Sequence, residues 1–257
     1  MQTTLGTQDQ ITLQDQTVLD VIVERAIDIG DGWLITYSVP SMQYADGRKY
    51  YTQEYYYPKV EDYSGIVKTT GMPVEYSDKT LADFKWEFYH GGAVVQKDMV
   101  SRYLFNIDMN IREAVGLYLW SATPGSGKTF LACLIGNELI KRGMQVKFIT
   151  VNDYIQAHRN GESQRYKDCS VLILDDVGAE DDKQEWIQGI LFGLVNARYA
   201  GHKLTMFTSN VDIKHCSKND RMVSRINRMA IPVRMPEYSV RDVQAEEWRE
   251  GYMRGWS

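Results

Sequence analysis

The sequence predicts an α/β fold in which a mostly parallel sheet is covered by helices on both faces, preceded by a small β-containing region. Two observations predict the sheet. Apolar runs of strand length alternate with segments of helical spacing from Gly116 onward, and a glycine-containing turn joins the first such run to the first such helix. A third observation sets the preceding region apart, because most of the 17 tyrosines lie before Gly116.

The expected elements follow one another without long interruptions after Gly116. Strand patterns cover residues 116–120, 145–151, 171–175, 203–208 and 231–234, and helical patterns cover 128–142, 153–159, 184–199 and 219–229. A further helix, about 97–106, is expected before the first strand. Alternating strands and helices imply parallel strand neighbours, and ligands of such sheets bind at the carboxyl ends of the strands.

Residues 1–71 are expected to form a separate partner-binding region, and residues 72–257 the main domain. Residues 1–16 are polar and rich in Gln and Thr, so we expect them to be mobile or loosely docked. Residues 33–39 and 49–57 are strand-like with a turn between them, which predicts a β-hairpin. The hairpin tyrosines either face a partner or lie on the half-buried faces of a small sheet. Gly71-Met72-Pro73 marks the expected boundary.

The composition is that of a soluble globular chain, with 44% hydrophobic and 25% charged residues. No run approaches the ~20 apolar residues of a membrane span, and the chain starts with polar residues, so we expect a cytoplasmic protein without a membrane partner. The three cysteines and four histidines are scattered, which argues against a zinc site or a disulfide framework. The net charge of −5 means that any DNA contact needs a local basic patch or an oligomer.

The segment from Trp120 to Thr129 reads as a phosphate-binding loop. Ala122 stands where the pattern G-x-x-x-x-G-K-[ST] has its first glycine, and the pattern is otherwise complete. The two later glycines allow a tight turn that aims backbone N–H groups at phosphate oxygens, and a helix N-terminus follows. Lys128 is expected to reach the β and γ phosphates, and the Thr129 hydroxyl to bind Mg²⁺. The residues expected to bind the nucleotide here are Thr123, Pro124, Gly125, Ser126, Gly127, Lys128, Thr129 and Phe130. The alternative is an ordinary glycine-containing turn.

Polar residues end two later strand patterns. Asp175 and Asp176 follow a run of four apolar residues, and we expect Asp175 to bind Mg²⁺ and Asp176 to activate the attacking water. Asn210 follows the strand pattern over 203–208 and is expected to hold that water or to sense the γ-phosphate. Taken singly, the Asp pair could equally cap a turn and Asn210 a helix.

Three arginines share one face of the helix expected over 219–229. Arg221, Arg225 and Arg228 are spaced by four and three residues. An arginine presented to the nucleotide of a neighbouring subunit stabilises transition-state charge. A solvated basic face is the competing interpretation.

The ordered set of motifs resembles the AAA+ ATPases of the DnaC/DnaI helicase-loader and IstB group. The resemblance covers about residues 72–245, and the segment Leu174-Asp175-Asp176-Val177-Gly178-Ala179-Glu180 is its most telling part. It implies ATP and Mg²⁺ bound between subunits of a homo-oligomer. In this resemblance Asp175 is the Walker B acid, Asp176 the catalytic acid and Asn210 sensor I. Arg225 is then the arginine finger with Arg228 as runner-up, and Arg241 is a sensor II residue.

Three departures from the family pattern bear on function. Asp176 stands where many AAA+ proteins have Glu, which suggests slow turnover. Residues 152–169 form a shorter segment than the single-stranded-DNA-contacting region of DnaC-like loaders, so DNA could be reached directly or only through the helicase. Residues 1–70 contain no cysteine, unlike the zinc-binding front region of some members.

The leading hypothesis is an ATP-dependent helicase loader that docks on a replicative DNA helicase. The first alternative is an IstB-like transposition helper that coats DNA in an ATP-dependent assembly. A second alternative, from a different class, is a nucleotide-gated adaptor without significant hydrolysis. A nucleoside kinase ranks last, because no residue set resembles an acceptor pocket.

Overall fold

The computed structural model of the chain consists of two compact units, residues 1–63 with 141–143 and residues 64–140 with 144–257. The boundary expected between Gly71 and Met72 therefore lies within the second unit. Thr70 is buried there, and its carbonyl accepts the Phe148 N–H at 2.8 Å. The residues that the structure describes are 8–12, 18–28, 32–43, 46–51, 55–58, 69–178 and 185–254.

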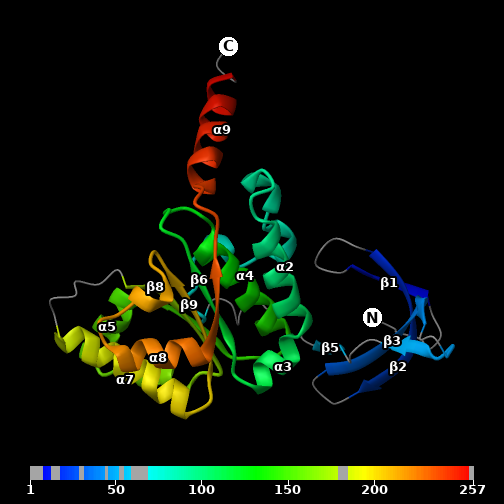
Figure 1. Cartoon of the computed structure of the whole chain (residues 1–257), viewed down its shortest axis with the longest axis horizontal. Helices are drawn as coiled ribbons and strands as arrows, with labels where there is room; N and C mark the ends of the chain where they lie inside the picture. Colours follow the sequence, from blue (N-terminus) through cyan, green and yellow to red (C-terminus); the bar gives the residue numbers. More distant parts are fainter. Residues whose placement is uncertain are drawn as a thin grey trace. The chain divides into compact units, whose positions relative to one another are not determined.

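The first unit contains an antiparallel sheet (Figure 1). Its strands are β1 (Gln8–Thr12), β2 (Val18–Asp28), β3 (Gly32–Gln43), β4 (Lys49–Tyr51) and β5 (Tyr55–Pro58). Strands β1 to β4 follow one another in space, and β5 also pairs with β3. The pairing of β3 with β4 and β5 forms the expected hairpin. Residues 8–12 were expected to be loosely docked, but they pair with β2 as a strand.

Alternate residues of β2 and β3 form the core of the first unit. Val21, Val23, Ile35, Tyr37 and Val39 are each at most 2% exposed, as expected when one face of a sheet is covered. Tyr50 packs against this cluster, whereas Tyr51 is 52% exposed. The tyrosines whose side chains are described therefore include both a core residue and a surface residue. The side chains of residues 55–57 lie outside the described part.

The second unit contains a five-stranded sheet, and its order is β10-β6-β9-β8-β7. The strands are β6 (Gly116–Trp120), β7 (Val146–Thr150), β8 (Val171–Val177), β9 (Leu204–Ser209) and β10 (Ala230–Arg234). All neighbouring pairs are parallel. The expected α/β fold is thus confirmed, and each expected strand is present within two residues of its predicted bounds.

Helices cover both faces of this sheet (Figure 1). Helices α5 (Val151–Arg159), α7 (Glu185–Ala200) and α8 (Asp220–Met229) lie on one face. Helices α2 (Val94–Phe105), α3 (Ile107–Arg112) and α4 (Lys128–Lys141) lie on the other. The remaining helical segments are η1 (Val74–Tyr76), η2 (Leu81–Asp83), η3 (Trp86–Tyr89), α6 (Gln164–Asp168), η4 (Ile213–His215) and α9 (Val240–Arg254). Helices α3, α6 and α9 were not predicted.

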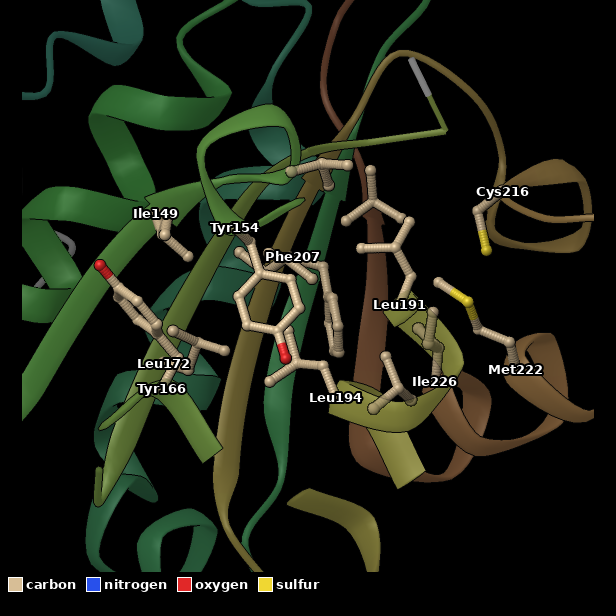
Figure 2. Packing of buried hydrophobic residues seen from close by; sticks show 14 of the residues in the cluster. Ile149, Tyr154, Tyr166, Leu172, Leu191, Leu194, Phe207, Cys216, Met222 and Ile226 are labelled. Carbon is tan, nitrogen blue, oxygen red and sulfur yellow. The ribbon is translucent and has the colours of Figure 1, made fainter. Parts of the chain in front are cut away.

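An apolar cluster joins α5, α7 and α8 to the sheet (Figure 2). Tyr154 of α5, Leu191 and Leu194 of α7, Phe207 of β9 and Ile226 of α8 are all fully buried in it. Burying each large side chain of this kind contributes about 1.5–3 kcal/mol. The cluster lies against β8 and β9, and therefore holds in place the strand that contains Asp175 and Asp176 and the strand that Asn210 follows. In the described part of the chain, no helix has both the length and the apolar character needed to cross a membrane.

Candidate nucleotide-binding site

The loop between β6 and α4 lies at the carboxyl edge of the sheet. Gly125 and Gly127 adopt positive φ angles of 75° and 83°, a region that side chains rarely enter. Space is also restricted, because a Cβ on Gly127 would approach the Tyr89 hydroxyl to 2.8 Å. The Tyr89 hydroxyl donates to the Ser126 carbonyl at 2.8 Å. The loop is therefore held tightly against the segment that precedes α2.

Lys128 is the first residue of α4 and is only 6% exposed. Its Nζ donates to the carbonyls of Ser121 and Thr123 and to the Ser126 hydroxyl, at 3.2–3.3 Å. Burial lowers the pKa of Lys128 below its usual value, and the nearby carboxylates of Asp176, Glu237 and Asp175 act in the opposite direction. A buried ammonium curled inside such a loop is suited to bind a polyphosphate.

Thr129 and Asp175 lie together beneath the loop. The Thr129 hydroxyl donates to Asp175 Oδ1 at 2.8 Å, and the Thr208 hydroxyl of β9 donates to the same oxygen at 2.6 Å. Burial raises the pKa of Asp175, partly offset by these two hydrogen bonds. A buried carboxylate next to a hydroxyl matches the oxygen ligands that Mg²⁺ prefers, so Thr129 and Asp175 fit a magnesium site.

Asp176 and Asn210 meet at the same edge of the sheet. The ladder between β8 and β9 shifts register between Leu174 and Val177, and Asp176 within this shift has a φ of 62°. Its backbone N–H donates to the Thr208 hydroxyl at 3.0 Å, and its exposed carboxylate receives the Asn210 amide at 3.4 Å. Because of this bulge, the two carboxylates point in different directions: Asp175 is buried and Asp176 faces solvent.

An aromatic pocket of about 590 Å³ adjoins the phosphate-binding loop, a size typical of sites for small ligands. Phe130 stacks on Phe84 with ring centroids 6.0 Å apart and contacts Tyr76 at 5.0 Å. The buried Asn137 amide of α4 donates to the carbonyls of Tyr76 and Lys79, which fixes this wall. Other lining residues are Glu75, Lys79, Asp83, Lys85, Phe88, Tyr89, Gly125, Ser126, Gly127, Lys128, Thr129, Val240 and Arg241. The pocket can hold a planar base next to the loop.

Arg241 lies at the start of α9 beside the phosphate-binding loop. The backbone N–H groups of Val240 and Arg241 both donate to the Gly125 carbonyl, at 3.1 and 3.4 Å. Arg241 also lines the pocket. The structure therefore brings together the loop residues, Asp175, Asp176, Asn210 and Arg241.

Arg225 and Arg228 belong to α8, which covers the face of the sheet opposite α4 (Figure 1). The Arg225 guanidinium lies over the Phe192 ring at 4.9 Å and donates to the Arg221 carbonyl at 3.2 Å. Arg228 is exposed and donates to the Tyr199 hydroxyl at 3.3 Å. Both arginines are thus positioned by α7, on the other side of the sheet from the phosphate-loop helix.

Sequence reasoning missed several residues that shape this site. Thr208 lies at the end of a predicted strand, where its hydroxyl gives no sign that it contacts Asp175. Phe84 and Tyr89 lie before the first predicted strand of the main domain and belong to no motif. Glu237, whose carboxylate accepts the Thr123 N–H at 2.9 Å, follows the last predicted strand. No local pattern indicated that any of the last three approaches the loop.

Comparison with protein families matches residues 66–224 to the family described as IstB-like ATP binding protein. The chain belongs to this family. The matched residues include the phosphate-binding loop, Asp175, Asp176 and Asn210. The family assignment confirms the resemblance that the sequence motifs indicated.

The chain is also similar to the replicative helicase loader DnaC of Escherichia coli (strain K12). The two are 28% identical over 137 residues, which are 49% of this chain and 54% of DnaC. The chain thus spans about half the length of the curated relatives it matches.

Solved AAA+ domains share the fold of the second unit. The crystal structure of DnaI has a TM-score of 0.54 and 25% identity, covering 65% of this chain and 96% of the DnaI chain. DnaA from Aquifex aeolicus, solved bound to AMPPCP, has a TM-score of 0.51 and 25% identity, covering 64% of this chain and 51% of DnaA. The AAA+ fold class is therefore confirmed.

Proposed function

We propose that this protein is an ATP-dependent helicase loader that binds and hydrolyses ATP in a homo-oligomer and loads or remodels a replicative DNA helicase. The observation that carries the proposal is the convergence of Lys128, Asp175 and Asn210 at one edge of the sheet, next to the aromatic pocket. The similarity to the helicase loader DnaC supports the choice of partner.

In this proposal the residues divide the work of nucleotide binding. The aromatic pocket takes the adenine, and residues 123–129 with Lys128 take the phosphates. Thr129 and Asp175 hold Mg²⁺, which neutralises phosphate charge when bound. Arg241 adds positive charge from the other side of the loop, since it lines the same pocket.

For hydrolysis, Asp176 accepts a proton from the attacking water, and Asn210 orients either that water or the carboxylate. The contact of 3.4 Å between the Asn210 amide and Asp176 Oδ1 supports this pairing. Arg225, with Arg228 as runner-up, stabilises transition-state charge on the nucleotide bound to a neighbouring subunit. The position of α8 across the sheet from α4 supports action between subunits rather than within one.

The test is co-purification with a hexameric replicative helicase in ATP and Mg²⁺. The full chain is compared with Lys128→Ala and with a chain that starts at Thr69, which retains the buried Thr70. We expect the full chain to retain the helicase. The chain starting at Thr69 should lose it if residues 1–68 carry the recognition surface. Absence of helicase from the full-chain sample contradicts the loader proposal.

A second candidate is an IstB-like transposition helper that coats DNA, and it is favoured by the family match over residues 66–224. It requires binding to duplex DNA without helicase, with a steep dependence on salt because phosphate contacts release counterions. A gel-shift series over salt concentration, with and without ATP, distinguishes the two. Absence of an ATP-dependent complex at low salt removes this candidate.

A further inference from the structure

Glu237 lies beside the first half of the phosphate-binding loop because β10 pairs in parallel with β6. Arg234 is the register partner of Trp120, and the next residue, Met235, donates its N–H to the Trp120 carbonyl at 2.7 Å. The chain after β10 therefore continues alongside the chain after β6. Three residues beyond Arg234, this parallel course places Glu237 next to Ala122 and Thr123.

The Glu237 carboxylate accepts four hydrogen bonds from the loop. Oε2 accepts the Thr123 N–H at 2.9 Å, the Thr123 hydroxyl at 2.8 Å and the Ser121 hydroxyl at 3.1 Å, and Oε1 accepts the Ala122 N–H at 3.3 Å. Burial acts to raise the pKa of Glu237, but these hydrogen bonds outweigh it and the pKa lies below its usual value. The group is thus an ionised carboxylate at neutral pH.

The residues that Glu237 holds are also the residues that hold Lys128. The carbonyls of Ser121 and Thr123 accept the Lys128 ammonium at 3.3 and 3.2 Å. Thr123 therefore binds Glu237 through its N–H and Lys128 through its C=O. Movement of the Thr123 backbone would therefore displace the Lys128 side chain, which is expected to contact the phosphates.

We propose that Glu237 is a positioning residue of the nucleotide site, an internal carboxylate that fixes the first half of the phosphate-binding loop and presets Lys128 for the phosphates. This inference rests on the proposed nucleotide binding. It names a residue that lies outside the loop motif and belongs to the segment joining β10 to α9.

The surrounding contacts favour a permanent support over a placeholder that leaves when phosphate binds. Backbone hydrogen bonds hold the segment on both sides of Glu237, from Met235 to the Trp120 carbonyl and from Val240 to the Gly125 carbonyl. Arg234 lies 3.5 Å from Glu237 Oε1 and offsets part of its charge. The repulsion between this carboxylate and a bound phosphate is thereby reduced.

The experiment compares Glu237→Gln and Glu237→Ala with the wild-type chain. Glu246→Gln is the matched control, because it removes the same charge from an exposed position on α9. Dissociation constants for ADP and ATP with Mg²⁺ are measured by calorimetry, and KM and kcat by steady-state ATPase assays. We expect Glu237→Ala to weaken both nucleotides about tenfold, the effect of losing hydrogen bonds to a charged group. Glu237→Gln should be intermediate, since its amide oxygen still accepts, and KM should change more than kcat.

Unchanged affinity in Glu237→Ala overturns the proposal, as does an unchanged KM with a reduced kcat. Tighter binding also overturns it, because that result identifies a competing placeholder. If the wild-type chain binds no nucleotide, the proposed function fails instead. If Glu237→Ala does not fold, nucleotide affinity is measured instead in a double-mutant cycle of Glu237→Gln with Thr123→Val. Non-additive losses of affinity support the inference, and additive losses contradict it.

Discussion

The Thr208 hydroxyl donates to Asp175 Oδ1 at 2.6 Å and at the same time accepts the Asp176 N–H at 3.0 Å. A single hydroxyl of β9 thus fixes the side chain of one carboxylate residue of β8 and the backbone of the next. The bulge that separates the buried Asp175 from the exposed Asp176 depends on this contact. Thr208 is therefore as important to the geometry of the site as the residues of the recognised motifs.

Replacing Thr208 by Val keeps the shape of the side chain but removes this hydroxyl. Asp175 would lose a donor in a buried site, which costs about 1–3 kcal/mol of stability. We expect the urea midpoint of Thr208→Val to fall by a corresponding amount, and Mg²⁺-dependent nucleotide binding to weaken. Thr208→Ser retains the hydroxyl and serves as the control. Equal losses in both variants would show that packing rather than the hydrogen bond matters.

Replacing Lys128 by Met should affect ATP binding without lowering the stability of the nucleotide-free protein. Burial lowers the pKa of Lys128, so the charged ammonium is less favourable in the folded than in the unfolded chain. This penalty on the stability of the nucleotide-free protein develops as pH falls from the unfolded-state pKa toward the lower folded-state pKa, and it is present at pH 7. Lys128→Met should therefore melt no lower than the wild type without nucleotide. It should also lose the rise in melting temperature that ATP and Mg²⁺ produce. A retained ATP-induced rise contradicts the assigned role.

Mixing variants tests whether an arginine acts between subunits. Lys128→Ala and Arg225→Ala should each lack ATPase activity, and a mixture of the two should recover part of it, because some interfaces then combine an intact loop with an intact arginine. Arg228→Ala is tested in the same way, and Arg221→Ala is the control on the same helix. No recovery with either arginine variant excludes a shared site. Absence of hydrolysis in the wild type instead supports the nucleotide-gated adaptor.

The aromatic pocket predicts a dependence on the base of the nucleotide. Phe130→Ala removes a ring that stacks on Phe84 and lines the pocket. Loss of stacking on a base costs about 1–3 kcal/mol, so the dissociation constant for ATP should rise about tenfold or more. Binding of inorganic triphosphate, which has no base, should change little. Equal weakening of both ligands would place the base elsewhere.

Tyr89 provides a separate test of how the loop is held. Tyr89→Phe retains the ring but removes the hydrogen bond to the Ser126 carbonyl. A net contribution of about 1 kcal/mol predicts a loss of several-fold in ADP affinity with little change in secondary structure. Circular dichroism checks the fold and calorimetry the affinity. Unaltered ADP affinity shows that the loop keeps its conformation without this bond.

The sequence by itself determined the parallel sheet, the strand bounds and the motif residues, because these features depend on local patterns. Short apolar runs bounded by turn residues form the buried strands of the second unit, and glycines with positive φ, such as Gly125 and Gly127, mark a tight turn. Parallel strands then bring their carboxyl ends to one edge, which is why the sequence alone predicts Asp175 and Asn210 near Lys128.

Tertiary structure alone decided which further residues reach that edge. Glu237 meets Thr123 only because β10 pairs with β6 in one particular register, and Tyr89 meets Ser126 only because the segment before α2 folds back over the loop. The strand β1 in residues 8–12 likewise depends on its partner β2. Such contacts join residues far apart in the chain, so their energies are set by packing and register, which no local pattern of residues records.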